Sequence, residues 1–180
     1  MAVHAMIDIE TLDTSPQSVV LSVGAVKFNP YDETEPYNEI YYKLDLDDQD
    51  RLHRTTSDST IEWWSKQNED VRNEAFSEDG RIGVDQFLNE LRSWLSNVHT
   101  IWGHGYGFDL TILEDMYKGS GKSIPWNFWQ VKDSRTLFSL CKKDPRKLLG
   151  NENLHNALAD AYFQAKGVQM AFNELSVTRA

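Results

Sequence analysis

An apolar segment near the start of the chain, HAMIDIETLD at residues 4–13, carries Asp8 and Glu10 two positions apart. Its apolar composition and short length favour a buried β-strand. In a strand, positions i and i+2 point to the same face of the sheet, so the two carboxylates lie side by side. Two like charges among Met and Ile side chains cost free energy unless something compensates them. We therefore expect this face of the strand to meet positive charge.

The segments that follow predict a mixed sheet. Residues 18–30, SVVLSVGAVKFNP, are typical of a long strand, and the polar turn at 13–17 makes this strand an antiparallel neighbour of residues 3–9. Residues 38–46 are predicted to complete a meander. Helices are then expected at 60–67, 69–76 and 83–97, followed by a strand at 99–105, a helix at 108–119, a strand at 129–134, and helices at 135–143 and about 155–175.

This order predicts an α/β fold in which an antiparallel meander is followed by β-α-β-α, giving a mixed sheet flanked by helices. No internal repeat or linker divides the chain, so residues 1–180 are expected to form a single domain.

The charge balance limits the classes of partner. Lys and Arg total 18 against 28 Asp and Glu, a formal net charge of -10, which argues against a protein that coats nucleic acid by bulk electrostatics. An enzyme that meets phosphates through metal ions stays compatible with this charge. No apolar run approaches the roughly 20 residues of a membrane span, and the start lacks the pattern of a signal peptide. We expect a cytoplasmic protein with no membrane partner.

Four acids are candidates for a metal site. Asp8 and Glu10 share a strand face, Asp109 opens a predicted helix after a glycine-rich strand exit, and Asp160 lies on the last helix. Carboxylates from separate elements are what two hard divalent cations need. Simpler explanations stay open, because Asp109 also suits a helix N-cap and Asp160 a solvated surface.

His155 stands five residues before Asp160. Five residues of regular helix turn through about 500°, which leaves the two side chains roughly 140° apart. Both can address one site only if His155 lies at the helix entry, a placement that Asn153 as the cap would allow. A structural or solvated histidine is the alternative.

Three short motifs contain these residues: DIET, GFDLTIL and HNALAD. Their order and spacing resemble the exonuclease motifs of the DnaQ-like 3'-5' exonucleases, in the DEDDh subgroup whose third motif is His-x4-Asp. Flanking segments such as TIEWWSKQ and VKDSRTL resemble the small phage and bacterial branch that contains the DexA exonuclease of T-even phages and a mycobacterial exoribonuclease. The resemblance spans nearly the full chain and implies a ribonuclease H-like fold.

The resemblance also implies a mechanism. His155 would act as the general base on an attacking water, and a nucleoside 5'-monophosphate would leave the 3' end of single-stranded DNA or RNA. Two Mg2+ or Mn2+ ions would be held by Asp8, Glu10, Asp109 and Asp160.

Further residues are candidates for substrate contacts. The resemblance places Thr11 and Leu12 at the terminal nucleotide, although Leu12 is equally explained as the apolar end of a strand. His104 stands where the family commonly has Asn, and it either braces the strand exit or touches substrate. Trp63 and Trp64 diverge by about 100° on a helix, so one is expected in the core and the other beside the nucleotide.

Basic residues supply the remaining candidates. Arg135 suits a phosphate because its guanidinium can bind phosphate oxygens in a bidentate manner, with pairing to a neighbouring acid such as Asp133 as the alternative. The run KKDPRK at residues 142–147 is interpreted as a solvated loop that could also guide a strand.

Two rival functions stay open at this point. A ribonuclease H-like endonuclease would use the carboxylates without needing His155, and a non-catalytic nucleic-acid-binding scaffold would keep the fold without its chemistry. The sequence also leaves open DNA against RNA and a monomer against a homodimer.

Overall fold

The computed structural model describes residues 3–105, 107–150 and 154–179. The strands in this part of the chain are β1 (His4–Thr11), β2 (Val20–Phe28), β3 (Tyr37–Leu44), β4 (Arg81–Ile82), β5 (Thr100–Gly103) and β6 (Val131–Asp133). They form a six-stranded sheet in the order β4-β3-β2-β1-β5-β6. The pairs β1–β2 and β2–β3 are antiparallel, whereas β3–β4, β1–β5 and β5–β6 are parallel. The mixed sheet with its N-terminal meander is therefore confirmed.

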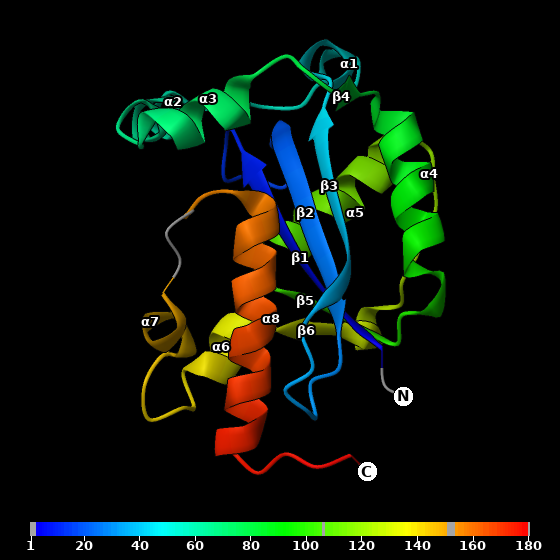
Figure 1. The fold of residues 1–180 in the computed structure, drawn as a ribbon. Coiled ribbons are helices and arrows are strands. Elements are labelled where there is room, and N and C mark those ends of the chain that lie inside the picture. Colours follow the sequence, from blue (N-terminus) through cyan, green and yellow to red (C-terminus); the bar gives the residue numbers. More distant parts are fainter. Residues whose placement is uncertain (1–2, 106, 151–153, 180) are drawn as a thin grey trace.

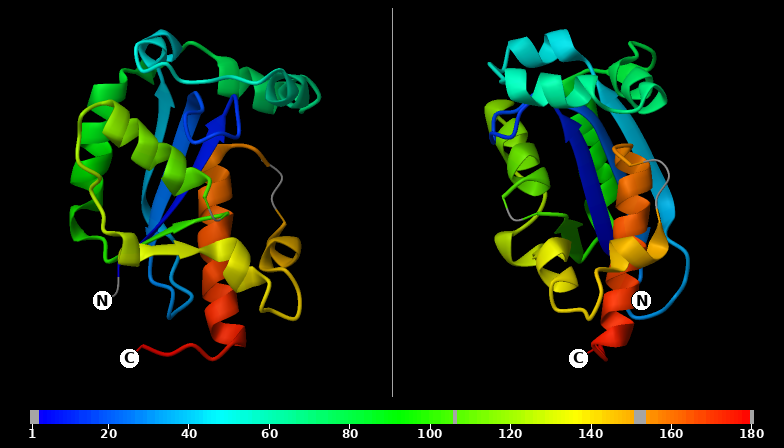
Figure 2. Two further views of the ribbon diagram at one scale, coloured as in Figure 1. Left: turned by 180° about the vertical axis from the view of Figure 1, so that it is seen from behind. Right: turned by 90° about the vertical axis from the view of Figure 1, so that its left-hand side faces the viewer.

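The helices cover both faces and one end of the sheet. They are α1 (Leu46–Asp50), α2 (Asp58–Ser65), α3 (Glu69–Phe76), α4 (Val84–Trp94), α5 (Asp109–Gly119), α6 (Ser134–Phe138), α7 (Pro145–Leu149) and α8 (Ala157–Glu174). Helix α8 crosses one face, α4 and α5 lie on the other, and α2 and α3 lie over one end (Figures 1 and 2). In the described parts of the chain, no helix has the length and apolar character needed to cross a bilayer.

The alternation of side chains along β1 assigns its two faces. Ile7 and Ile9 belong to a core cluster with residues of α4 and α5. Met6 belongs to a second cluster, formed with α6 and α8. Asp8 and Glu10 lie two and four residues after Met6, so their side chains point to the same face of the sheet as Met6. Both carboxylates therefore lie on the face that α8 covers.

A third cluster attaches α2 and α3 to the end of the sheet where β1 stops and β2 begins. Its buried members are Leu12, Val19, Leu21, Trp64 and Ala75. The indole N–H of Trp64 also donates to the Thr11 carbonyl at 2.9 Å. This packing fixes the position of α2 relative to the last residues of β1.

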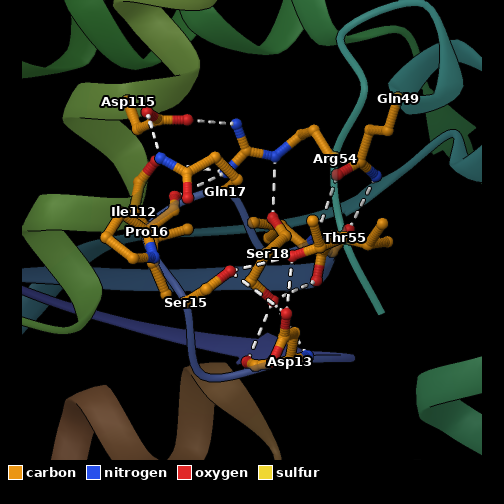
Figure 3. Close-up of polar contacts among 12 residues, drawn as sticks. Asp13, Ser15, Pro16, Gln17, Ser18, Gln49, Arg54, Thr55, Ile112 and Asp115 are labelled. Atoms are coloured by element: carbon orange, nitrogen blue, oxygen red, sulfur yellow. Dashed lines mark hydrogen bonds and ion pairs between the residues drawn. The ribbon is translucent and has the colours of Figure 1, made fainter. Parts of the chain in front are cut away.

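The turn between β1 and β2 is held by Arg54, whose guanidinium is buried (Figure 3). Its Nε donates to the Ser18 carbonyl at 2.7 Å, and one Nη donates to the Pro16 carbonyl at 3.1 Å. The same side chain reaches α5, where it pairs with Asp115 at 3.0 Å and donates to the Ile112 carbonyl at 3.4 Å. Arg54 therefore anchors the segment that follows β1 to helix α5.

The structure differs from the sequence-based expectations mainly in short elements. The two-residue strand β4 and the helix α1 were not expected, and α7 replaces part of the loop predicted at 142–147. Helix α6 ends at Phe138 rather than near residue 143, because the amides of Leu140 and Cys141 bond three residues back in tight turns. None of these differences moves the predicted site.

Candidate active site

β1 supplies the first two carboxylates. Asp8 and Glu10 are buried, with 9% and 8% of their surface exposed. Asp8 is paired with Gly24 on β2, and the Gln164 side-chain amide on α8 donates to its Oδ1 at 2.8 Å. The predicted arrangement of two acids on one strand face is therefore present, and the face is covered by α8.

Asp109 is fixed by backbone N–H groups of β1 and of the residue that follows β5. It is the first residue of α5, and its Oδ1 accepts from the N–H of Ile9 at 3.2 Å while its Oδ2 accepts from the N–H of His104 at 3.0 Å. The residue at the N-cap position is Phe108. Helix capping therefore does not account for this acid, whose carboxylate instead joins the start of α5 to β1 and to the end of β5.

His155 and Asp160 enter from the start of α8. The helix begins at Ala157 and is capped by Asn156, whose side chain accepts from the Ala159 N–H. The cap predicted at Asn153 is therefore wrong, and Asn153 itself lies outside the described residues. His155 precedes the helix with φ of +68°, and its backbone N–H donates to Asp160 Oδ2 at 2.9 Å. The histidine lies at the helix entry, as a shared site requires.

Strand β1 and the start of α8 bring three of the predicted residues into one group. Ligand atoms of Glu10, His155 and Asp160 all lie within 4.8 Å of one another. Asp8 and Asp109 line the same cavity of about 390 Å³. All five residues of the predicted constellation therefore meet at one place, between β1, the start of α5 and the start of α8.

The electrostatics of this cluster favour a cation. Burial raises the pKa of Asp8 and of Glu10 well above the usual range, and repulsion from the other acids raises both further. Burial also raises the pKa of Asp109 to about 6, against backbone hydrogen bonds, among them those from His104 and Ile9, that lower it. Crowded carboxylate oxygens are the donors that hard divalent cations prefer. The donor set fits a divalent metal ion, which would replace the mutual repulsion with attraction.

The wall of the same cavity carries two arginines. Arg135 is exposed, and its guanidinium donates to the His104 carbonyl at 3.3 Å; its backbone N–H, rather than its side chain, bonds Asp133. Arg146 belongs to the run at 142–147 and pairs with Asp144 at 2.6 Å. The alternative explanation for Arg135, an ion pair with Asp133, is not found among the described residues.

A second cavity of about 420 Å³ shares Glu10 with the first as a lining residue. Thr11, Trp63 and the hydroxyl residues Ser59 and Thr60 line it. The Trp63 ring also packs edge-to-face against His155, with centroids 4.7 Å apart and planes at 85°. Trp63 therefore touches both the second cavity and the predicted general base.

Two predicted substrate contacts are placed elsewhere. Leu12 and Trp64 are 8% and 1% exposed, belong to the cluster under α2 and α3, and line neither cavity. Of the two adjacent tryptophans, Trp64 is a core residue, whereas Trp63 lines the second cavity. Leu12 and Trp64 are therefore core residues that lie outside both cavities.

His104 braces the strand exit. Its backbone N–H holds Asp109, and its Nδ1 lies 2.9 Å from Ser134 Oγ, which donates to the Gly103 carbonyl. Because the single hydroxyl proton is used on that carbonyl, His104 Nδ1 acts as the donor to Ser134. Burial is the main reason that the pKa of His104 is lowered to about 4, so the ring is neutral at pH 7.

Residues at the site that were not expected from the sequence include Phe108, which lines both cavities, and Gln164. Arg146 belongs to the basic run at 142–147 that was expected as a solvated loop able to guide a strand. Gln164 had an available signal, because it lies four residues after Asp160 and therefore on the same face of α8.

Comparison with known proteins identifies the family. A family model described as the 3'-5' exoribonuclease Rv2179c-like domain matches residues 3–172. This chain belongs to that family. The match confirms the resemblance to 3'-5' exonucleases that the three motifs predicted. An exodeoxyribonuclease of Enterobacteria phage T4 is 27% identical to this Rv2179c-like chain, over 73% of the chain and 68% of the relative.

Solved structures confirm the fold of this Rv2179c-like domain. The zinc-bound E. coli exonuclease I complex with single-stranded DNA matches with a TM-score of 0.72 at 12% identity. A second E. coli exonuclease I structure, with a dA16 oligonucleotide, matches with a TM-score of 0.64 at 14% identity. Each match covers 98% of this chain but 42% of the exonuclease I chain. The ribonuclease H-like mixed sheet is therefore confirmed in a chain that spans less than half of those proteins.

Proposed function

We propose that this protein hydrolyses the terminal phosphodiester bond at the 3' end of single-stranded nucleic acid and releases nucleoside 5'-monophosphates. The observation that carries the proposal is the approach of Glu10, His155 and Asp160 to within 4.8 Å, beside Asp8 and Asp109. Membership in a 3'-5' exoribonuclease domain family supports the same reaction.

Four carboxylates would hold two Mg2+ or Mn2+ ions: Asp8, Glu10, Asp109 and Asp160. When bound, such cations neutralise charge that develops on the phosphate and make an attacking water more acidic. Hydrogen bonds hold three of these carboxylates in place before a metal ion binds. Two backbone N–H groups hold Asp109, and the backbone N–H of His155 holds Asp160. The side-chain amide of Gln164 holds Asp8.

His155 would take the proton from the attacking water. Burial lowers its pKa, which keeps the imidazole neutral and able to accept a proton near pH 7. Its backbone bond to Asp160 and its contact with Trp63 hold the ring next to the acids.

The two cavities would receive the strand. We place the terminal nucleotide in the second cavity, where Trp63 can stack against a base and Thr11 lies beside Glu10. Arg135 and Arg146 would contact phosphates in the first cavity. His104 would act by bracing Asp109 rather than by touching substrate.

Substrate strands labelled at the 5' end test this function. Each strand is offered with a free 3' end or with a 3' end closed by an inverted nucleotide, in Mg2+ or in Mn2+. We expect a ladder that shortens one nucleotide at a time and requires the free end. Internal cuts in both strands would instead indicate the endonuclease, and binding without cleavage would indicate a scaffold.

Matched DNA and RNA strands belong in the same assay. The matching family is described as an exoribonuclease domain and the phage T4 relative as an exodeoxyribonuclease, so relative rates on the two strands assign the sugar. We propose one exonuclease domain over residues 1–180 acting in the cytoplasm, as a monomer or as a homodimer.

A further inference from the structure

Gln164 is a buried amide at the acidic cluster. It lies one turn after Asp160 on α8, the helix that crosses the face of the sheet in front of β1 (Figure 1). Only 8% of its surface is exposed, and its Nε2 donates to Asp8 Oδ1 at 2.8 Å. α8 therefore presents to the site both a carboxylate and, one turn later, an amide donor.

The Gln164 amide turns its nitrogen toward Asp8. This is the arrangement that a metal-binding Asp8 requires, because an ionised carboxylate only accepts hydrogen bonds. This orientation leaves Gln164 Oε1 buried with no hydrogen-bond partner among the described residues. A buried acceptor without a partner is costly, which indicates that the bond to Asp8 decides how the side chain sits.

Asp8 and Asp109 are held in different ways. Both oxygens of Asp109 accept backbone N–H groups, which belong to Ile9 and His104. For Asp8, the hydrogen bond found within the described chain comes from the Gln164 side chain. A single side-chain substitution on α8 can therefore free the Asp8 carboxylate to rotate, whereas no side-chain substitution removes the two backbone bonds that hold Asp109.

We propose that Gln164 is a positioning residue for the metal site, which holds Oδ1 of Asp8 and so limits the rotation of that carboxylate before a cation binds. This role rests on the proposed function, because it requires Asp8 to be a metal ligand. Groups that orient metal ligands through hydrogen bonds commonly change metal affinity by about 10- to 100-fold when they are removed.

The same helix offers a matched control at Gln169. This amide is also buried, at 5% exposed, and its Nε2 donates to the carbonyls of Asn29 and Thr34 at 2.9 and 2.8 Å. Its Oε1 also lacks a partner among the described residues. It holds the loop between β2 and β3 rather than an acid, and it does not line the acidic cavity.

The test measures Mn2+ binding to the full chain by titration calorimetry, without nucleic acid. Gln164→Met keeps the approximate size of the side chain and removes the donor, and Gln169→Met does the same at the control position. We expect Gln164→Met to weaken Mn2+ binding by about tenfold or more, with Gln169→Met close to wild type even if both variants lose similar thermal stability.

Each outcome decides a separate point. Equal Mn2+ affinity in wild type and Gln164→Met, or an equal loss in Gln169→Met, would overturn the role of Gln164 and leave the proposed exonuclease intact. Absence of Mn2+ binding in the wild-type chain would overturn the proposed metal site and this role together. If Gln164→Met does not fold, Gln164→Asn gives the same test, because its amide is one methylene too short to reach Asp8.

Discussion

Gly24 lies opposite Asp8 in the β1–β2 ladder, and the start of α8 packs directly onto it. A Cβ at position 24 would lie 2.2 Å from the Leu158 nitrogen and 2.3 Å from the Ala157 carbonyl carbon. Backbone atoms cannot swing away as a flexible side chain can. The absence of a side chain at Gly24 therefore lets α8 approach the sheet closely enough to place Asp160 beside the acids of β1.

Gly24→Ala should displace the start of α8 from the sheet. We expect it to cost about 1–3 kcal/mol of unfolding free energy through overpacking and to lower nuclease activity and Mn2+ affinity together. Gly119→Ala is the control, because nothing lies within 4 Å of a Cβ at that position. Thermal melts and cleavage rates check both variants, and a fully active Gly24→Ala protein would rule out this role of the close contact.

Asp109→Asn should abolish cleavage while leaving the fold nearly intact. An asparagine keeps one oxygen to accept a backbone N–H from Ile9 or His104, but it loses the charge that a cation needs. Circular dichroism checks the fold, and the labelled-strand assay checks activity. Full activity in this variant would contradict the assignment of Asp109 as a metal ligand.

His155→Ala should separate turnover from metal binding. Loss of a general base typically slows a reaction by about 10²- to 10⁴-fold, whereas Mn2+ affinity should change little if the acids alone hold the cations. Single-turnover rates at saturating Mn2+ and calorimetric titration measure the two quantities. A parallel fall in both would instead make His155 a ligand, a role that its position within 4.8 Å of Glu10 and Asp160 allows.

The stability of the folded protein should depend on pH and on divalent metal through the same carboxyl groups. Burial and repulsion raise the pKa of Asp8 and Glu10, and burial raises that of Asp109 to about 6, whereas carboxyls in an unfolded chain titrate near 4. The folded metal-free protein then holds more protons than the unfolded chain above about pH 4, so its stability falls as pH rises through the folded-state pKa values.

Divalent cations should reverse this loss, because they bind the ionised acids. We expect Mn2+ to raise the melting temperature more at pH 8 than at pH 5, where protons compete for the same oxygens. Scanning calorimetry with Mn2+ or with a chelator measures the two shifts. Equal shifts at both pH values would show that Mn2+ binds away from these acids.

Much of the fold was predictable from local pattern. The two-residue period of β1 correctly placed Asp8 and Glu10 on one face, and the short turn correctly made β1 and β2 antiparallel. Strand β4 was missed because two residues carry no period. The start of α8 was predicted to within two residues, but its cap was assigned to Asn153, whereas the structure uses Asn156 three residues later.

The acids and the proposed general base lie within the three motifs and were predictable from the sequence, whereas the other site residues were less so. The three motifs named the five residues that meet between β1, α5 and α8, although their chemical roles stay predictions. The sequence left open whether Leu12, and which of Trp63 and Trp64, lies in the core, because sequence adjacency does not say which neighbour points inward; the structure places Leu12 and Trp64 there. Gln164 was missed because a single glutamine has no motif, and its partner Asp8 lies 156 residues away.

Crystals of the protein soaked in Mn2+ test the central claim most directly, through anomalous scattering at the manganese edge. We predict two manganese peaks in the cavity between β1, α5 and α8, in contact with carboxylate oxygens of Asp8, Glu10, Asp109 and Asp160. An empty cavity in a crystal that binds manganese elsewhere would contradict the claim that these acids form a metal-dependent nuclease centre.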